Sequence, residues 1–378
     1  MTAKSKRELL EAIRPRYLKA NKSEKAHMLD EFCAATGYHR KYAIRLLKHG
    51  PPAKKLKKTG RPKIYQGEVV SALTQIWEIC GRICSRRLHP FLPEIVRVLE
   101  QHQELILSAE VKQLLFQISR ASIDRCLKPA RFEHRRGLST TKPGALLKKA
   151  IPVRTFTPWE EERPGFEEID LVAHCGETTA GQYLNTLTVT DLATGWTECL
   201  AILHKSQHLV AEAIREMRLR LPFALLGIDS DNGSEFINDL LFNYCQDEKV
   251  TFTRSRPYRK NDQAHVEQKN WSVVRHVIGY DRLETEAEWL ILKAIYANLR
   301  LYVNFFQPVL KLVSKERVGE KVIKRYDTAT TPYQRVLDSP YVSETVKIYL
   351  RQQYAQLNPV TLRNRIDANV ARLWKLVR

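Results

Sequence analysis

The stretch GIDSDNGSEF at residues 227–236 places three acidic residues, Asp229, Asp231 and Glu235, around a Ser-Asp-Asn-Gly turn. Asp, Asn and Gly favour ordinary surface turns, because they accept or support the backbone angles that turns require. Carboxylates are also the ligands that hard divalent cations such as Mg²⁺ prefer. The stretch therefore predicts either a plain turn or one part of a metal site, and the choice depends on carboxylates elsewhere in the chain.

Two further acids are candidates for the same site. The segment FEEIDLVAH sets Asp170 between apolar residues in mid-strand, where an acid is costly to bury unless something neutralises it. Glu168, two residues earlier, is less favoured than Asp170 mainly because it lies farther from the strand's centre. Glu267, in NDQAHVEQKNW, follows a helix start near Asn261. A surface strand and a solvated helix face are the ordinary alternatives for Asp170 and Glu267.

The elements around these acids predict a mixed α/β layer architecture. Apolar and polar residues first alternate in three segments, which predicts a three-stranded meander, and helical patterns then alternate with two strands. The order is β-β-β-α-β-α-β-α, over residues 165–174, 182–195, 196–204, 206–221, 223–231, 234–248, 249–255 and 261–279. Asp229 and Asp231 lie at the carboxyl end of the fourth strand, where α/β sheets bind their ligands. The alternation of side chains along a strand places both on the same face.

Taken together, the three acids are arranged as in a known family. Asp231 and Glu267 are separated by 35 residues, with Asp170 on the first strand. This resembles the D,D(35)E arrangement of the retroviral-integrase-like DDE transposases, and Asp-Asn-Gly followed by Phe236 and Val-Glu followed by Asn270 belong to the match. The resemblance covers about 165–280, although many relatives have Gly where this chain has Ala264. It implies an RNase H-like core with a five-stranded mixed sheet whose first three strands are antiparallel, in a transposase of a bacterial insertion sequence.

The resemblance also implies a mechanism. Asp170, Asp231 and Glu267 would hold two Mg²⁺ or Mn²⁺ ions, which activate an attacking oxygen and stabilise a leaving oxygen. Water would cleave DNA at an element end and free a 3′-hydroxyl, which the same site would join to target DNA. Three residues could support the acids: His174, Asn232 and Asn270. Core packing is an equal alternative for His174.

The net charge of +20 is unevenly distributed. Residues 1–150 contain 32 Lys and Arg against 13 Asp and Glu, residues 151–250 contain 7 against 17, and residues 251–378 contain 23 against 12. Basic flanks suit a polyanion, most often nucleic acid. An acidic centre would repel that polyanion unless cations lie between them, which agrees with a metal site there.

The basic residues gather in segments that suit DNA. Residues 6–48 predict three helices, with Ser23 starting the second and Gly37 ending it, and the last two form a helix-turn-helix pattern. A small bundle with a solvated basic face is the alternative. Residues 49–63 predict a basic linker whose GRPK resembles an AT-hook, and residues 66–128 a second helical unit, capped at its last helix by Ser119 or Ser122. The residues expected to contact DNA are Arg40, Lys41, Arg45, Lys48, Arg61, Lys63, Arg125, Lys128, Arg254, Arg256, Arg259 and Lys260.

These patterns predict six regions along the chain. They are a helix-turn-helix domain at 1–50, a linker at 51–64, a second helix-turn-helix-like domain at 65–130, a linker at 131–160, the DDE core at 161–282, and a helical and basic region at 283–378. Seven cysteines without a CxxC pair argue against disulfides and a four-ligand zinc site. The N-terminus has no secretory signal, and no stretch is apolar enough to span a membrane.

We therefore expect a bacterial cytoplasmic, nucleoid-associated protein that acts on double-stranded DNA as a homodimer or higher oligomer. The competing classes are a DNA-binding regulator with an idle integrase fold and a metal-dependent nuclease that does not join DNA.

Overall fold

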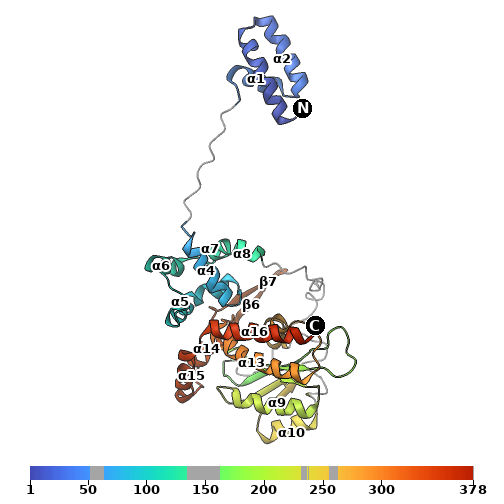
Figure 1. Ribbon diagram of the computed structural model, residues 1–378, viewed down its shortest axis with the longest axis vertical. Coiled ribbons are helices and arrows are strands. Elements are labelled where there is room, and N and C mark those ends of the chain that lie inside the picture. Colours follow the sequence, from blue (N-terminus) through green and yellow to red (C-terminus); the bar gives the residue numbers. More distant parts are fainter. Residues whose placement is uncertain (52–63, 134–161, 231–235, 237, 255–262, 378) are drawn as a thin grey trace. The chain divides into compact units, whose positions relative to one another are not determined.

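The computed structural model describes residues 1–51, 64–133, 162–230, 236, 238–254 and 263–377. The chain forms two compact units, Met1–Ile64 and Tyr65–Arg378 (Figure 1). In the described residues no helix is both long and apolar enough to cross a membrane.

The first unit is a bundle of three helices, as the sequence predicts. They are α1 (Ala3–Lys19), α2 (Lys22–Thr36) and α3 (Arg40–His49). The expectation that Ser23 caps the second helix is wrong. Asn21 is the N-cap, because its side chain accepts the Glu24 N–H while the Glu24 carboxylate accepts the Asn21 N–H, which forms a capping box. Gly37 ends α2 in the left-handed conformation, as predicted.

The second unit begins with five helices. They are α4 (Glu68–Ile79), α5 (Ser85–Gln101), α6 (Ala109–Gln117), α7 (Arg120–Cys126) and α8 (Lys128–Glu133). Ser119 is the cap of α7, since its side chain accepts the backbone N–H of Ser122.

A five-stranded sheet follows, and it is the element that positions the candidate site. Its strands are β1 (Phe166–Ala173), β2 (Asn185–Asp191), β3 (Thr197–Ile202), β4 (Gly227–Ser230) and β5 (Thr251–Arg254). Their order is β3-β2-β1-β4-β5; β1 pairs antiparallel with β2, as β2 does with β3, while β4 is parallel to β1 and to β5. The predicted mixed sheet with an antiparallel meander is therefore confirmed.

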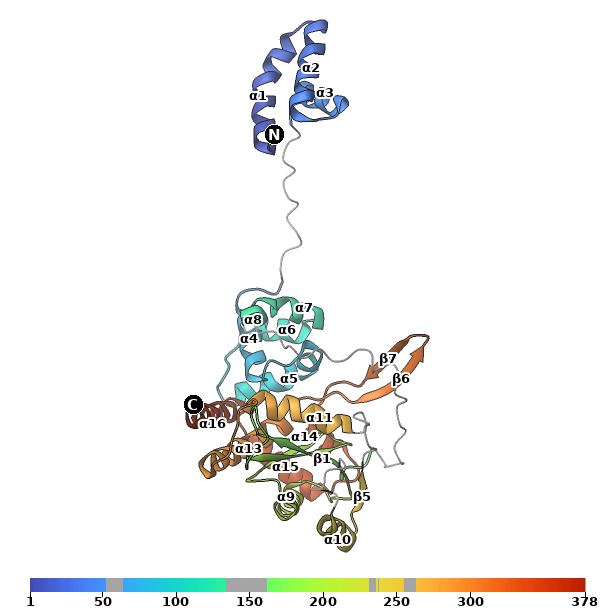
Figure 2. The same ribbon diagram turned by 90° about the vertical axis from the view of Figure 1, so that its right-hand side faces the viewer.

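Helices cover both faces of this sheet. On one face, α9 (Gln207–Arg220) and α10 (Asp239–Asp247) pack on a core that includes Ile169 of β1 and Ile228 of β4. On the other face lie α11 (Ala264–Lys269), which continues as a π-helical segment over Asn270–Arg275 and α12 (His276–Ile278), and the long α13 (Glu286–Phe306). Figure 2 shows α11 on one side of β1, with α9 and α10 on the other.

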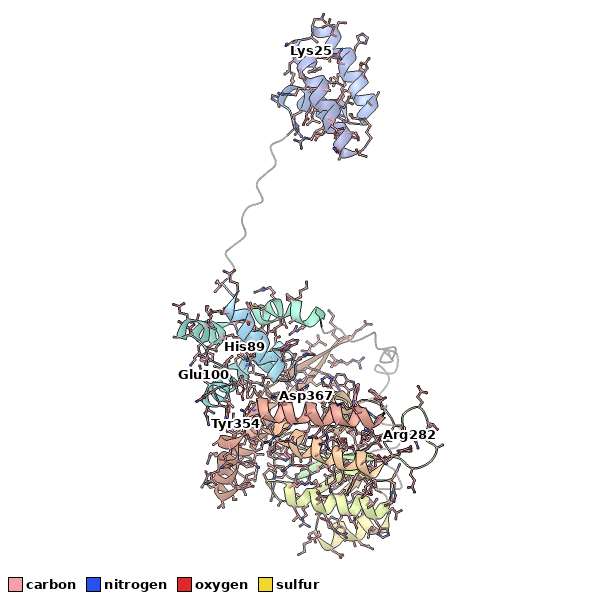
Figure 3. The ribbon with its side chains drawn as sticks, in the orientation of Figure 1. Lys25, His89, Glu100, Arg282, Tyr354 and Asp367 are labelled. Carbon is pink, nitrogen blue, oxygen red and sulfur yellow. The ribbon has the colours of Figure 1, made fainter. Side chains whose placement is uncertain are left out.

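The second face is part of a larger core that runs through the second unit. The buried residues include Leu73 of α4 and Ile95 of α5 together with Tyr296 of α13. The C-terminal helices α14 (Pro332–Asp338), α15 (Glu344–Gln356) and α16 (Pro359–Val377) complete it. Tyr354 of α15, which is labelled in Figure 3, donates a hydrogen bond to the Glu94 carboxylate of α5 at 2.6 Å. Residues 65–130, predicted from the sequence as a separate domain, share one core with the sheet and the C-terminal helices.

One element of the C-terminal region differs from the helical expectation. β6 (Leu312–Val318) and β7 (Lys321–Tyr326) form an antiparallel hairpin. Every residue of both strands is exposed except Ser314 and Tyr326, which are half-buried. Because neither face is buried, the hairpin lacks the regular alternation of apolar and polar residues that reveals a half-buried strand in a sequence.

Candidate functional site

Two of the three expected acids lie on elements that pack against each other. Asp170 is a half-buried residue of β1, and Glu267 is an exposed residue of α11, which contacts β1 directly. Asp231 and Asn232 lie outside the described residues. The described β4 ends at Ser230, whose partner in the parallel register with β1 is Ile169. In the sequence, Asp170 follows Ile169 directly, and Asp231 follows Ser230 directly.

A hydrogen bond joins the helix of Glu267 to Asp170. Asn270, three residues after Glu267, donates from Nδ2 to Oδ2 of Asp170 at 2.6 Å. The other oxygen of Asp170, Oδ1, accepts the N–H of Leu171 at 2.8 Å. Each carboxylate oxygen has more than one lone-pair direction, so these bonds orient the group and leave acceptor capacity on it.

Glu168 has a place that sequence reasoning missed. It is almost completely buried, and its Oε2 accepts the backbone N–H groups of His265 at 3.0 Å and Val266 at 2.9 Å. The first N–H groups of a helix need acceptors, and the N-cap of α11, Gln263, has no side-chain cap bond. A carboxyl group from β1 therefore caps the helix that carries Glu267. Burial raises the pKa of Glu168 to about 8, and the charges of Asp229 and Glu267 act in the same direction, while the two backbone bonds oppose the rise.

Gln263 is a second residue whose role no sequence pattern indicates. It is buried, and its side-chain amide lies 3.5 Å from the carbonyl oxygen of Ile169 on β1 and 3.3 Å from that of Asp229 on β4. One side chain thus connects the start of α11 to two neighbouring strands. The only available signal was its position at the beginning of the predicted helix, close to Glu267 in the sequence.

Asp229 lies beside Glu168 on the sheet. The two residues are partners in the parallel register of β1 and β4, and both are buried. Oδ1 of Asp229 accepts a hydrogen bond from the Thr253 hydroxyl of β5 at 2.6 Å. Two buried acids therefore lie next to each other on the face that α11 covers, and each has a hydrogen-bond donor on a neighbouring element.

His174 is fully buried directly after β1. Its Nε2 lies 2.8 Å from the hydroxyl oxygen of Thr186, which is in turn 2.6 Å from the hydroxyl of Tyr296 on α13. Burial lowers the pKa of His174 to about 3, with a smaller contribution from the positive charge of Arg275. These features favour core packing over substrate contact, the two alternatives that the sequence leaves open.

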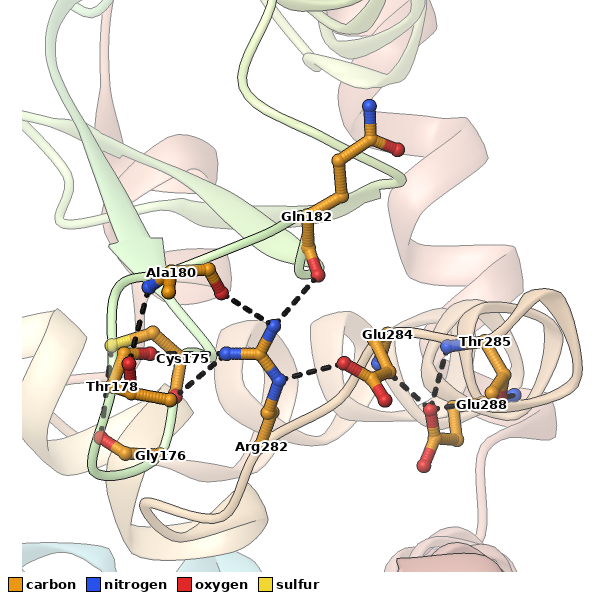
Figure 4. A network of polar contacts seen from close by, with 9 residues as sticks. All are labelled: Cys175, Gly176, Thr178, Ala180, Gln182, Arg282, Glu284, Thr285 and Glu288. Atoms are coloured by element: carbon orange, nitrogen blue, oxygen red, sulfur yellow. Dashed lines mark hydrogen bonds and ion pairs between the residues drawn. The ribbon is translucent and has the colours of Figure 1, made fainter.

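The loop that follows His174 is held by one side chain. The Arg282 guanidinium donates to the carbonyl oxygens of Cys175, Thr178, Ala180 and Gln182, at 2.9–3.3 Å, and its Nε donates to the Glu284 carboxylate at 2.6 Å (Figure 4). Backbone carbonyls in an irregular loop need donors, and a guanidinium has five N–H groups in a fixed plane. Arg282 therefore fixes the β1–β2 connection at the carboxyl end of β1.

A divalent cation is compatible with the donors of this site. In the part of the chain that is described, no group of three His, Cys, Asp or Glu is close enough to hold a metal. Two oxygen donors, Asp170 and Glu267, nevertheless occur on elements in contact, and the residue after β4 is a third acid. Carboxylate oxygens suit Mg²⁺ or Mn²⁺ rather than a soft metal.

The expected DNA-contacting residues lie in several places. Arg40, Lys41, Arg45 and Lys48 are exposed on α3, where Arg40 forms an ion pair with Asp30 and Arg45 lies over the ring of Tyr42. Arg125 of α7 and Lys128 of α8 are also exposed. Arg254 is the last residue of β5. Arg61, Lys63, Arg256, Arg259 and Lys260 lie outside the described residues.

Sheet order and the packing of α11 on β1 define an α/β protein of mixed sheet, with an acidic site between the strand and the helix. No family model matches the chain. It is 41% identical over 333 residues to the uncharacterized protein y4rM of Sinorhizobium fredii, and the match covers 87% of this chain and 94% of that protein. The chain belongs to the same family as y4rM.

Solved structures similar to the chain include two retroviral integrase domains. One is the catalytic core domain of BIV integrase, with a TM-score of 0.32 and 19% identity over 46% of this chain and 95% of that one. The other is the catalytic core domain of HTLV-2 integrase in complex with magnesium, in a dimeric form, with a TM-score of 0.29 and 12% identity over 39% and 90%.

Proposed function

We propose that the chain is a DNA transposase, which binds the terminal repeats of its own mobile element and catalyses metal-dependent 3′-end cleavage and strand transfer into target DNA. The observation that carries the proposal is the hydrogen bond from Asn270 to Asp170. It joins the strand with the first expected acid to the helix with the third, beside a parallel strand that ends immediately before the second.

Each residue has a separate task in this proposal. Asp170, Asp231 and Glu267 hold Mg²⁺ or Mn²⁺, two ions in each site, and Asn270 keeps the Asp170 carboxylate in one orientation. Bound there, the ions supply Lewis-acid activation of the attacking oxygen and stabilisation of the leaving oxygen, and they offset the negative charge of the site towards phosphate. Glu168 and Gln263 hold the start of α11 in place on β1 and β4.

Cleavage and joining are the same exchange of phosphodiester bonds. In cleavage, a water oxygen bonds to phosphorus at the element end and the bond to the 3′-oxygen breaks, which leaves a 3′-hydroxyl. In joining, that hydroxyl oxygen bonds to a target phosphorus and displaces the 3′-oxygen of the target strand. The proposal gives no side chain the role of a covalent nucleophile.

The exposed basic residues of α3 and of α7 and α8 would locate the DNA. Lys41, Arg45 and Lys48 recur at helical spacing on α3, so they share one exposed face, which suits a recognition helix in a major groove. Cutting and joining two element ends requires two active sites, and we therefore propose a homodimer or higher oligomer on DNA, in the cytoplasm of a bacterium.

The test is strand transfer by the purified protein with Mg²⁺ or Mn²⁺, using its own terminal-repeat DNA and a plasmid target. Asp170→Asn, Asp231→Asn and Glu267→Gln should each abolish transfer while DNA binding persists and weakens steeply with salt, because phosphate contacts release counterions. Cleavage without joining would identify a nuclease. DNA binding without either reaction would identify a regulator with an idle core. An Asp231→Asn variant with full activity would refute the acid triad.

A further inference from the structure

The β6–β7 hairpin is built as a projecting ribbon with a rigid base. Asp327 accepts the Lys311 N–H at 2.8 Å and donates its own N–H to the Lys311 carbonyl at 3.0 Å, and its carboxylate also accepts a hydrogen bond from Arg335 of α14 at 2.6 Å. Arg86 of α5 lies over the ring of Tyr326 at 4.9 Å. The hairpin therefore has a fixed direction relative to the second unit, from which it extends (Figure 2).

Beyond this base, neither face of the ribbon is covered by the described residues. Five aliphatic side chains of the two strands are exposed: Val313 at 69%, Val318 at 61%, Val322 at 50%, Leu312 at 46% and Ile323 at 43%. A two-stranded hairpin that packs on nothing is marginally stable in water. Exposed aliphatic groups along an otherwise charged ribbon are compatible with a surface that contacts a partner.

The charge of the ribbon selects the kind of partner. Residues 311–326 contain six Lys and Arg and only two Glu. The antiparallel register places Lys315 opposite Lys324, and alternation puts Arg317 on the same face, so three cations lie close together. Like charges in such a pair destabilise an isolated hairpin. A polyanion would remove that repulsion.

The shape of the ribbon fits duplex DNA. Six paired positions give it a length of about 20 Å, and the major groove, about 12 Å wide, admits a two-stranded β-ribbon. Cations on the ribbon can contact phosphates, while aliphatic side chains contact thymine methyl groups.

The base of the hairpin is also close to the candidate site. Lys311, just before β6, donates from Nζ to the carbonyl of Ala193 at 2.8 Å. Lys269, the last residue of α11, lies with its Nζ 3.4 Å from the carbonyl of Gly195, in the same turn between β2 and β3. The base of the ribbon and α11, the helix of Glu267, thus contact the same turn between β2 and β3. A duplex held by the ribbon would pass beside that helix.

We infer that the β6–β7 hairpin is a DNA-binding ribbon that inserts into the major groove of the duplex beside the candidate active site. The inference rests on the proposed function, since it assigns the surface that holds the substrate of that site.

The experiment compares two triple variants of the full chain. Lys315→Ala, Arg317→Ala and Lys324→Ala remove three cations from one face of the hairpin. Arg365→Ala, Arg372→Ala and Lys375→Ala remove three exposed cations from α16 and are the matched control. Affinity for a short fluorescein-labelled duplex is measured by anisotropy over a series of salt concentrations, in EDTA so that no reaction occurs.

The hairpin variant should bind at least about tenfold more weakly. The slope of log affinity against log salt, which is negative, should become shallower by about 2–3, because each lost phosphate contact reduces its magnitude by about 0.9. The control should change both quantities much less. Dimethyl sulfate should methylate guanine N7 in the major groove less in the wild-type complex than in free DNA, and this protection should disappear in the hairpin variant.

The outcomes separate the two proposals. If the wild-type protein binds no duplex, the proposed function fails. If it binds and the two triple variants lose affinity equally, the hairpin is no special surface and only the present inference fails. If the hairpin variant binds DNA normally but becomes a smaller species in sedimentation, the ribbon is instead a contact between copies of the chain, which also overturns the inference. Unchanged circular dichroism and melting temperature confirm that the variants fold.

Discussion

Glu168 on β1 accepts the backbone N–H of Val266 on α11 at 2.9 Å, across 97 intervening residues of chain. This bond and its neighbour from His265 supply the cap that α11 lacks from its own N-terminal residue. The strand with the first expected acid therefore determines where the helix with the third one begins. A buried carboxyl group with this task is a positioning residue, and it can be separated from a metal ligand by experiment.

Replacement of Glu168 by Ala should disturb α11 more than replacement by Gln. The Ala variant leaves the N–H groups of His265 and of the buried Val266 without their acceptor, and an unsatisfied buried N–H costs about 1–3 kcal/mol in the free energy of unfolding. Gln keeps an acceptor oxygen, and because the pKa of Glu168 is raised to about 8, a neutral amide resembles the group present at pH 7. Thermal unfolding should therefore show a clear loss for Ala and a small one for Gln.

Strand transfer should follow the same order, with Gln rescuing most of the activity. Amide hydrogen exchange at His265 and Val266 should accelerate in Glu168→Ala, since exchange reports local opening of the helix start. Equal and complete inactivation by Ala and Gln, with unchanged exchange, would instead make Glu168 a metal ligand.

Asn270 should matter through Asp170 rather than through the fold. Asn270→Ala removes the donor to Oδ2 of Asp170, and loss of a residue that orients a metal ligand typically costs about 10- to 100-fold in metal affinity or activity. Asn270→Asp should be worse, because it places a second negative charge against the first. The measurement is the strand-transfer rate as a function of Mn²⁺ concentration.

Asn298→Ala is the matched control for that measurement, since the Asn298 side chain donates to the Ala294 carbonyl within α13. A half-maximal Mn²⁺ concentration that stays the same in Asn270→Ala would contradict the orienting role.

The order of strands and helices along the chain could be predicted because it depends on local patterns, whereas the mixed sheet was implied by the family resemblance. Alternation of apolar and polar residues marks β1 to β3. In the structure, α13 begins with a capping box of Thr285 and Glu288. The same motif, Asn21 with Glu24, was also present at α2, but Ser23 is an equally good cap by residue type. The reciprocal hydrogen bonds in the structure identify the cap as Asn21.

The remaining features depend on contacts between distant parts of the chain. Glu168 and Gln263 gain their tasks only when α11 packs across β1 and β4, and no local pattern contains that information. The β6–β7 hairpin was not predicted because neither of its faces is buried. The packing of residues 65–130 against α13 and α16 was likewise invisible, because an amphipathic helix does not specify which apolar surface it will cover.

Arg282→Lys should loosen the loop at 175–182. Lysine has three donors on one nitrogen, so it cannot reach four separate carbonyl groups and the Glu284 carboxylate in the way that the guanidinium does. We expect a free energy of unfolding that is lower by about 1–3 kcal/mol, with a correspondingly lower melting temperature. Thermolysin should also cleave within the loop faster. Arg363→Lys is the control, because Arg363 forms an ion pair with Asp367 one turn along α16. Equal protease resistance of both variants would show that the loop keeps its conformation without the clamp.

His174 should make the fold sensitive to acid. Its pKa is about 3 in the folded protein and about 6.5 in the unfolded chain, so between these values only the unfolded chain takes up a proton. The stability that depends on neutral His174 is therefore complete above pH 6.5 and is lost as the pH falls towards 3. The loss at pH 5 should be about 2 kcal/mol. The buried carboxyl groups of Glu168 and Asp191 act in the opposite direction, since burial raises the pKa of Glu168 to about 8 and that of Asp191 to about 6.

A difference between two proteins isolates the contribution of His174. Gln can place its amide nitrogen where Nε2 of His174 meets the Thr186 hydroxyl, and it does not titrate. The free energy of unfolding, measured in urea from pH 7.5 to pH 4.5, should fall less in His174→Gln than in the wild type, although the variant starts somewhat lower at pH 7.5. Because both proteins share Glu168 and Asp191, those groups cancel in the difference. Parallel curves for the two proteins would mean that His174 is protonated in the folded state as easily as in the unfolded chain, and its burial would then have to be transient.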